Sequence, residues 1–385
     1  VCGTRGRWFE STLLYQKMTK EKKNKPSKEL PLGFVDRQEK ELLVRDFIIS
    51  NIKEIMIKYG FQYLETPSFE YTDSIGKFLP DKERPDEGVF SFQDENNWLS
   101  LRYDLTAPLA RYVAKNYLEI PKPFKRYQLG TVWRNEKPGP GRFREFLQFD
   151  ADYVGTKSLQ ADAELCVMIS EILEKCGLSK EEYIVKISSR KITEELFKKI
   201  NLDNNEQKLT ALRALDKIDR LGWEGVKQLL GDGRKDKSGD FTKGANLSLT
   251  NIEAIENKLR KKSPETEDLQ EIFKLFKDYN FTNFEFDSSI IRGLEYYTGP
   301  IFEVNLKFDV KNNKGQVIQF GSIGGGGRYD NLVNNFGNYE APATGISIGL
   351  DRLVYALMQK KEFKVKQSKP VVICIFDKGS MKEYI

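Results

Sequence analysis

The chain of 385 residues contains no histidine. This absence excludes a catalytic triad with a histidine base, zinc bound by histidine, and acid–base catalysis by an imidazole of the protein. Any chemistry has to rest on arginine, carboxylates, tyrosine, a bound metal or the backbone. Such groups suit reactions that need charge stabilisation more than proton transfer, so phosphoryl or nucleotidyl transfer is the leading class.

Cysteine is scarce and long apolar runs are missing. The four cysteines, at positions 2, 166, 176 and 374, form no CxxC pair. This usage is typical of free thiols in a reducing compartment, so we expect a cytoplasmic protein. No apolar run reaches about 18 residues, which predicts no membrane partner. The net charge of +5 neither requires nor forbids a nucleic-acid partner.

The length predicts two or three domains. Residues 1–30 lack periodicity, and we expect a disordered or non-native extension there, with 1–17 upstream of the native start. Residues 31–187 and 281–362 carry the strand and helix patterns of one sheet domain. Residues 188–280 are rich in charged helical segments, which indicates an inserted helical module.

Apolar residues at helical spacing predict a helix that starts with a capping box of Asp36 and Glu39 and ends before Gly60. The other expected elements are strands at 61–69, 98–102, 298–308 and 317–323, helices at 107–116 and 158–176, and a strand at 343–349 that leads into a helix.

Residues 124–153 carry the clearest pattern, a β-hairpin with a Pro/Gly-rich turn at 136–141. The return strand is apolar on one face, apart from Glu145. The opposite face is almost wholly polar and holds Arg142, Arg144, Phe146, Gln148, Asp150 and Asp152. The pattern predicts an antiparallel sheet with a functional face.

Arg134 and Arg142 flank the mouth of this hairpin. One interpretation is a surface ion-pair cluster. The other is a nucleotide clamp, with Arg134 at the reacting phosphate, Arg142 near the terminal phosphate and Phe146 stacked on the base. Gln148 and Asp152, farther along the same face, would then meet a second, polar substrate.

Two later segments also suit a pocket. Residues 291–300 place an arginine beside a glycine, before a carboxylate and two tyrosines, which suits the wall of an anion-binding pocket. The four glycines at 324–327 lack the Gly-Lys-Ser/Thr ending of a P-loop, so close backbone approach to a ligand or a neighbouring strand is the alternative to a phosphate loop.

Two further polar positions have a structural and a functional interpretation. Arg352 lies early in a helix. It either binds an anion at the helix N-terminus or is an ordinary arginine on the helix surface. Asp104 with Thr106 either holds an ammonium group or caps a helix.

In this order, these residues resemble class II aminoacyl-tRNA synthetases, and specifically histidyl-tRNA synthetases of the bacterial type. Glu65-Thr66-Pro67 resembles motif 1, residues 124–152 resemble motif 2, and residues 343–353 resemble motif 3. The two segments at 291–300 and 324–330 resemble the histidine-specific signatures. The resemblance implies an α+β fold: an antiparallel sheet flanked by helices, with a helical insertion.

The resemblance also implies a cytoplasmic homodimer that activates histidine with ATP and Mg²⁺ and transfers it to tRNA(His). The motifs leave the metal ligands unknown. Arg292 would bridge the histidine carboxylate and the α-phosphate, and Arg134 would contact the α-phosphate, so both are expected to be catalytic. The implied ATP-binding residues are Arg134, Glu136, Arg142, Phe146 and Arg352. The implied histidine-binding residues are Asp104, Thr106, Gln148, Asp152, Arg292, Tyr296 and Tyr297.

The chain departs from the commoner family pattern at several positions. Asn135 stands where histidine is frequent, and aspartates at 104, 152 and 351 stand where glutamates are frequent. Charge or polarity is kept, so we expect activation to be intact. Because the motif 2 loop faces the tRNA acceptor end in this family, Asn135 puts the usual acceptor-end rule in doubt.

The family also has a C-terminal anticodon-binding domain of about 100 residues, an ordinary size for an α/β domain. After a basic linker at 363–370, only residues 371–385 resemble the start of that domain, with a short apolar run at 371–376. We therefore expect a C-terminally truncated copy that charges tRNA poorly.

The main alternative is the non-catalytic, synthetase-like regulatory subunit of ATP phosphoribosyltransferase, whose length is similar. The full set of arginines at 134, 142, 292 and 352, the helical insertion and the apolar run at 371–376 count against it. Another class II synthetase is disfavoured by the two histidine-type signatures.

Overall fold

The computed structural model describes residues 27–76, 88–236, 239–261, 263–264, 266–291, 297–312, 314–318, 320–360, 374 and 379. Two predicted site residues, Arg292 and Tyr296, lie outside the described residues, as do nearly all of the N-terminal extension and of the expected strand at 371–376. Within the described ranges, no helix combines the length and apolarity needed to cross a membrane.

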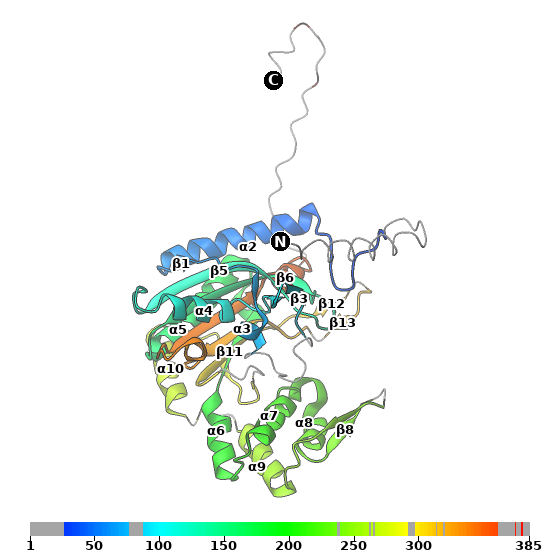
Figure 1. Cartoon of the computed structure of the whole chain (residues 1–385), viewed down its shortest axis with the longest axis vertical. Helices are drawn as coiled ribbons and strands as arrows, with labels where there is room; N and C mark the ends of the chain where they lie inside the picture. Colours follow the sequence, from blue (N-terminus) through cyan, green and yellow to red (C-terminus); the bar gives the residue numbers. More distant parts are fainter. Residues whose placement is uncertain are drawn as a thin grey trace, which may run out of the picture.

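An eight-stranded sheet forms the centre of the molecule (Figure 1), in the order β1-β5-β6-β15-β14-β11-β7-β10. Neighbours from β5 to β7 pair antiparallel, whereas the edge strands β1 and β10 pair in parallel. The strands are β1 (Gln62–Tyr63), β5 (Phe124–Trp133), β6 (Glu145–Val154), β7 (Tyr183–Ser189), β10 (Phe284–Phe286), β11 (Pro300–Leu306), β14 (Ser322–Arg328) and β15 (Ala343–Gly349).

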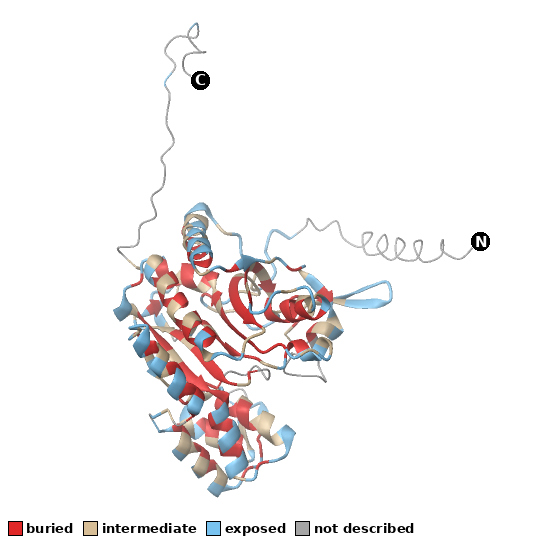
Figure 2. Cartoon of the chain, turned by 90° about the vertical axis from the view of Figure 1, so that its left-hand side faces the viewer, coloured by how far each residue is buried: buried red, intermediate tan, exposed pale blue. Residues whose placement is uncertain are grey.

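The main core lies between this sheet and the helices on one of its faces, where Figure 2 shows buried residues on both layers. These helices are α2 (Glu39–Lys58), α5 (Leu159–Lys175), α10 (Glu267–Asp278) and α11 (Leu350–Leu357). Phe149, Ala151 and Tyr153 are buried in this core, as the alternation along the hairpin predicted. The α+β sheet flanked by helices is thereby confirmed.

The two ends of helix α2 test the expected caps. Helix α2 begins after Gln38 and has no side-chain cap, so the capping box of Asp36 and Glu39 was a wrong prediction. At its other end Gly60 has φ +73°, and the N–H of Phe61 donates to the carbonyl of Met56 at 2.9 Å. This Schellman arrangement confirms the predicted end.

The predicted strand at 61–69 is broken. Only β1 and then β2 (Phe69–Tyr71) are extended strands, because the intervening carbonyls face a side chain instead of a neighbouring strand. Nη1 of Arg102 donates to the carbonyls of Thr66 at 2.7 Å and Pro67 at 3.3 Å. Strand β2 pairs instead with β4 (Asn97–Leu101), which also pairs with β3 (Ser91–Asp94).

Smaller elements complete the sheet domain. The helix expected at 107–116 is α4 (Thr106–Lys115), and the helix from 158 is α5, whose N-cap Ser158 accepts the N–H of Gln160. The predicted strand at 317–323 is divided, because Gly321 has φ +72° between β13 (Val317–Ile318) and β14. The remaining elements are α3 (Thr72–Gly76), β12 (Val310–Lys311), and the 3₁₀ helices η1 (Lys180–Glu182) and η2 (Val333–Phe336).

A helical lobe lies at one end of the sheet domain (Figure 1). It contains α6 (Arg190–Lys199), α7 (Asn205–Leu215), α8 (Ile218–Leu230), the hairpin β8 (Gly233–Lys235) and β9 (Phe241–Lys243), and α9 (Leu249–Leu259). The next helix, α10, packs against α5 and β7 of the sheet domain. The segment 188–280 thus contributes both a separate lobe and one helix of the main body.

Candidate active site

A cavity of about 430 Å³ opens on the sheet face opposite the main core. Strands β6, β14 and β15, the β5–β6 loop, and the first turns of α4 and α11 supply its walls. Every predicted site residue within the described part of the chain lines this cavity: Asp104, Thr106, Arg134, Glu136, Arg142, Phe146, Gln148, Asp152, Tyr297 and Arg352.

The glycines of β14 form the floor of the cavity. A Cβ atom at Gly324 would lie 2.7 Å from the carbonyl oxygen of Ser347, and one at Gly327 would lie 2.5 Å from that of Pro300. Both distances are shorter than a carbon–oxygen contact permits, so the glycine run lets three strands approach closely. A close-packed floor therefore replaces the phosphate-loop interpretation.

Arg134 is held in a fixed orientation at one end of the cavity. Its guanidinium carbon lies 4.5 Å from the ring centroid of Tyr103 and 5.2 Å from that of Phe146. Nε donates to the carbonyl of Tyr103 at 3.2 Å, and Nη2 donates to Oε1 of Gln148 at 3.4 Å. An arginine ordered in this way can meet a phosphate with little further loss of conformational freedom.

Two more arginines make this end of the cavity cationic. Arg142 projects from the β5–β6 loop and is exposed. Arg352, in the first turn of α11, donates to the carbonyl of Phe320 and lies 4.4 Å from its ring centroid. Glu136 lies at the same end and accepts the hydroxyl of Tyr103 at 2.6 Å. The group of three arginines suits a polyphosphate.

Carboxylates line the other end of the cavity. Oδ1 of Asp104 accepts the N–H groups of Thr106 at 3.1 Å and Ala107 at 3.0 Å, so it caps the first turn of α4. Burial raises the pKa of Asp104, and these two backbone hydrogen bonds oppose the rise. Because Asp104 also lines the cavity, capping and ligand binding are compatible at this position.

Two buried aspartates follow on β6. Burial and the neighbouring charge of Asp152 raise the pKa of Asp150 to about 7. Burial also raises the pKa of Asp152, and the guanidinium of Arg126 opposes that rise. Asp152 accepts the hydroxyl of Tyr329 through Oδ1, and its Oδ2 lies 3.0 Å from Nη2 of Arg126. A negative pocket with one arginine beneath it results.

Some residues around this pocket were not among the predicted site residues. Tyr329 and Asp150 stood in segments already singled out, the glycine-rich signature and the polar face of the hairpin. Only the strand register could have indicated Arg126, because this residue lies directly opposite Asp152 across the β5–β6 pair. No sequence pattern indicated Tyr103, since its contact with Arg134 depends on the path of the chain after β4.

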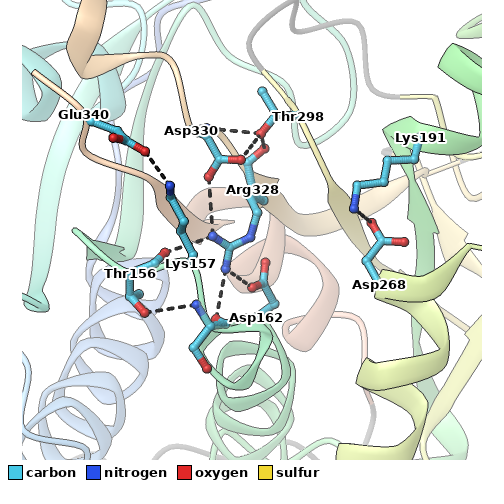
Figure 3. A network of polar contacts seen from close by, with 10 residues as sticks. Thr156, Lys157, Asp162, Lys191, Asp268, Thr298, Arg328, Asp330 and Glu340 are labelled. Atoms are coloured by element: carbon cyan, nitrogen blue, oxygen red, sulfur yellow. Dashed lines mark hydrogen bonds and ion pairs between the residues drawn. The ribbon is translucent and has the colours of Figure 1, made fainter. Parts of the chain in front are cut away.

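Arg328, in the second signature segment, has a structural role (Figure 3). Its guanidinium donates to the carbonyls of Thr156 at 2.9 Å and Ser158 at 3.0 Å, and it pairs with Asp162. Burial raises the pKa of Asp162 to about 6 against the opposing charge of Arg328. These contacts fasten the end of β14 to the N-terminus of α5.

No group of three or more Cys, Asp or Glu side chains placed to hold a metal ion is found in the described ranges. Mg²⁺ commonly binds proteins through one or two carboxylates together with substrate phosphates. Substrate phosphates held by the three arginines would therefore supply most of its ligands.

The antiparallel sheet, with a long hairpin that delivers arginines to a cavity, defines the catalytic domain of a class II aminoacyl-tRNA synthetase. The family model described as histidyl-tRNA synthetase matches residues 33–353. The chain belongs to the histidyl-tRNA synthetase family, whose members are aminoacyl-tRNA ligases.

Curated relatives agree with this assignment. The chain is 48% identical over 384 residues to histidine–tRNA ligase of Bartonella quintana (strain Toulouse), a match that covers 93% of this chain and 77% of that protein. It is 47% identical over 383 residues to histidine–tRNA ligase of Rhizobium meliloti (strain 1021), covering 92% and 76%. These matches favour the synthetase over the regulatory subunit of ATP phosphoribosyltransferase.

Solved structures show the same fold. Histidyl-tRNA synthetase from Nostoc sp. PCC 7120 is similar with a TM-score of 0.68 at 25% identity, over 87% of this chain and 76% of that chain. A protein from Bacillus halodurans C, described as an ATP phosphoribosyltransferase regulatory subunit/histidyl-tRNA synthetase, has a TM-score of 0.66 at 24% identity, over 86% and 84%. At that identity the second likeness shows the fold alone.

Proposed function

We propose that this chain activates histidine with ATP to form histidyl-adenylate and transfers the histidyl group to tRNA(His). The observation that carries this proposal is a single cavity with arginines at one end and carboxylates at the other. A carboxylate oxygen of histidine attacks the α-phosphorus of ATP, and pyrophosphate leaves. The attacking group is already an anion, so the step needs no general base, in keeping with a chain that has no histidine.

The cationic end of the cavity supports an ATP site. In this proposal Arg134 contacts the α-phosphate, where its charge stabilises the negative charge that develops in the transition state. Arg142 and Arg352 take the outer phosphates, and Glu136 and Phe146 take the adenine. The contacts of Arg134 with Tyr103 and Gln148 support this assignment, because they fix the guanidinium before ATP arrives.

The carboxylate end supports the histidine site. Asp104, Thr106 and Gln148 bind the amino-acid backbone groups, with the charge of Asp104 placed to hold the α-ammonium. Asp152 and Tyr297 contact the imidazole. Arg292 and Tyr296 keep their proposed roles from the sequence alone: Arg292 joins the histidine carboxylate to the α-phosphate, and Tyr296 lines the histidine site.

Mg²⁺ would enter bound to the phosphates of ATP. When bound, the ion would neutralise part of the negative charge on the phosphates. We place the reaction in the cytoplasm. The free thiols of Cys166 and Cys176, both buried, fit a reducing compartment.

A homodimer is supported by an apolar surface on the sheet of β2, β4 and β3. Phe69, Tyr71 and Phe92 share one face of this sheet and are 42–58% exposed, and the rings of Phe69 and Phe92 pack edge to face at 5.4 Å. Several exposed aromatic side chains on one small sheet are typical of a protein interface. A second copy of the chain is the proposed occupant.

A second cavity of about 610 Å³, between the β5–β6 loop, β7 and the helical lobe, supports the tRNA partner. Its walls include Arg142, Lys186, Lys217 and Arg220 together with the carboxylates of Asp216, Asp287 and Glu303, and Lys186 pairs with Asp287 at 2.7 Å. Lysines and arginines grouped in this way suit the phosphates of a nucleic acid. The position beside the first cavity would bring an acceptor end to the adenylate.

Histidine-dependent exchange of pyrophosphate into ATP tests the activation step. The wild-type protein should catalyse it, and Arg134→Ala should lower kcat by about 10²–10³-fold, as expected for loss of a charge aimed at the reacting phosphate. Arg260→Ala is a matched control, because Arg260 lies on the helical lobe and pairs with Glu256. A folded wild-type sample without exchange would contradict the proposed activity.

A further inference from the structure

Arg126 is a charged residue at the base of the carboxylate pocket. It lies on β5, directly opposite Asp152 on β6, and its side chain is fully buried. Nη2 is 3.0 Å from Oδ2 of Asp152 and donates to the carbonyl of Leu105 at 2.9 Å. Among the described residues, Nε and Nη1 of Arg126 have no hydrogen-bond partner.

Such incomplete hydrogen bonding is unfavourable for a buried arginine whose role is only structural. Burying a guanidinium is costly unless its N–H groups are paired. Arg102, another buried arginine beside this sheet, shows the contrast: its Nε and Nη1 donate to the carbonyls of Thr131, Thr66 and Pro67. Arg126 donates to one carbonyl, and its ion-pair partner is the carboxylate of Asp152, so its role depends on what Asp152 does.

The groups that face this ion pair come from several elements. Asp150 lies on β6 beside Asp152, Asp104 lies before α4, and the hydroxyl of Tyr329 donates to Asp152. Two further guanidinium groups act on these carboxylates, Arg134 on Asp104 and Arg102 on Asp150. Arg126 is the one that pairs with Asp152, whose charge it balances from below.

The charge balance at Asp152 determines which protonation state of an imidazole can bind against it. A neutral ring can donate its N–H to the carboxylate and add no charge to the ion pair. A protonated ring would bring a second cation next to the carboxylate that Arg126 already neutralises, in an interior where repulsion between like charges is strong. The protonated ring would also have to leave its hydration shell.

We propose that Arg126 is a positioning residue of the histidine pocket, which orients and neutralises Asp152 so that the pocket selects the uncharged form of imidazole. This inference rests on the proposed histidine site. It assigns Arg126 an effect on substrate recognition that acts through Asp152, without contact between Arg126 and the substrate.

The pH dependence of histidine binding tests the proposal, measured by calorimetry without ATP. For the wild-type protein, affinity should fall about tenfold per pH unit below about pH 6.5, where free imidazole becomes protonated. 1,2,4-Triazole-3-alanine, a histidine analogue with a much less basic ring, should bind without this loss. The comparison of the two ligands needs no variant of the protein.

Arg126→Met should weaken histidine binding by about 10–100-fold at about pH 8, because it leaves Asp152 without its counter-charge. The loss of affinity toward acid pH should disappear in this variant, since a protonated imidazole can then replace the missing cation. Arg126→Lys keeps a charge and should retain the acid-side loss. Arg328→Met removes a buried arginine that pairs with Asp162 and does not line the cavity, so it should lower the melting temperature and leave the shape of the pH profile unchanged.

Parallel pH profiles for the wild type and Arg126→Met would overturn the inference, as would equal acid-side losses for histidine and the triazole analogue. If Arg126→Met does not fold, the two-ligand comparison on the wild-type protein decides the case. Absence of histidine binding by the wild type at every pH would instead overturn the proposed function, and the inference with it.

Discussion

The carboxylate of Asp351 accepts the backbone N–H of Leu147 at 2.7 Å, which joins helix α11 to the start of β6 in the catalytic hairpin. Its other oxygen accepts Nε of Arg37 at 2.9 Å, from the segment before α2. Asp351 is buried, and its neighbour Arg352 lines the cavity. One carboxylate thus fixes the relative positions of two elements that carry proposed ATP-binding residues.

Asp351→Ala should lower the free energy of unfolding by about 2–4 kcal/mol, because a strand N–H loses its acceptor and Arg37 keeps only Glu41 and the carbonyl of Glu145. The KM for ATP should rise as well, since α11 loses its attachment to β6. Urea unfolding and pyrophosphate exchange measure the two effects. Glu41→Ala is the control: Glu41 is 3.4 Å from the same arginine in an i,i+4 pair and is more exposed. Its removal should cost less than about 1 kcal/mol.

Arg328→Met should destabilise the protein by about 3–5 kcal/mol, because the charge of Asp162 would remain buried without its guanidinium partner. The ion pair of Lys157 and Glu340 is a control in the same region (Figure 3), since both side chains are at least 75% exposed. Lys157→Ala should change stability by no more than about 0.5 kcal/mol. Equal losses in the two variants, measured by urea unfolding, would contradict the structural role of Arg328.

Gly345→Ala should impair histidine binding more than it impairs stability. A Cβ atom at this position would lie 2.8 Å from Cγ of Asp152, so the carboxylate would have to move. We expect the dissociation constant for histidine to rise at least about tenfold, which corresponds to about 1.4 kcal/mol. Gly139→Ala is the control, because its added methyl group would meet no atom within 4 Å. Unchanged histidine binding in Gly345→Ala would show that Asp152 is not placed as described.

The ligand-free protein should lose stability as the pH rises from about 4 to about 7. The pKa of Asp150 is raised to about 7 in the folded state, so the folded protein binds this proton more tightly than the unfolded chain does. Ionisation over this window therefore lowers the free energy of unfolding. Asp150→Asn should remove about 1–3 kcal/mol of the pH-dependent loss. Urea unfolding at several pH values would contradict this if both proteins showed the same slope.

Local sequence patterns correctly predicted those parts of the fold that depend on interactions between neighbouring residues. The alternation on the return strand placed Phe149 in the core and Gln148 on the cavity side, because strand side chains point to opposite faces in turn. Ser158 and Gly60 marked helix ends through hydrogen-bonding and left-handed geometry that act within a few residues.

Predictions from local sequence failed where a side chain from a distant part of the chain binds the segment. The strand expected at 61–69 is interrupted because Arg102, remote in the sequence, binds the carbonyls of Thr66 and Pro67. The capping box failed because Arg37, next to Asp36, pairs with Asp351 and the helix starts after Gln38. No periodic pattern in the sequence indicates either contact, because each joins residues that are far apart in the chain.

The sequence by itself determined the family, the absence of histidine chemistry and the residue types of the candidate site, since the motifs keep their order and spacing along the chain. Only the tertiary structure decided which charges meet. Strand register brings Arg126 to Asp152, and Arg328 at the end of β14 pairs with Asp162 of α5. The physical reason is burial: the ionisation of a carboxylate depends on the groups that surround it in space, and these come from several elements.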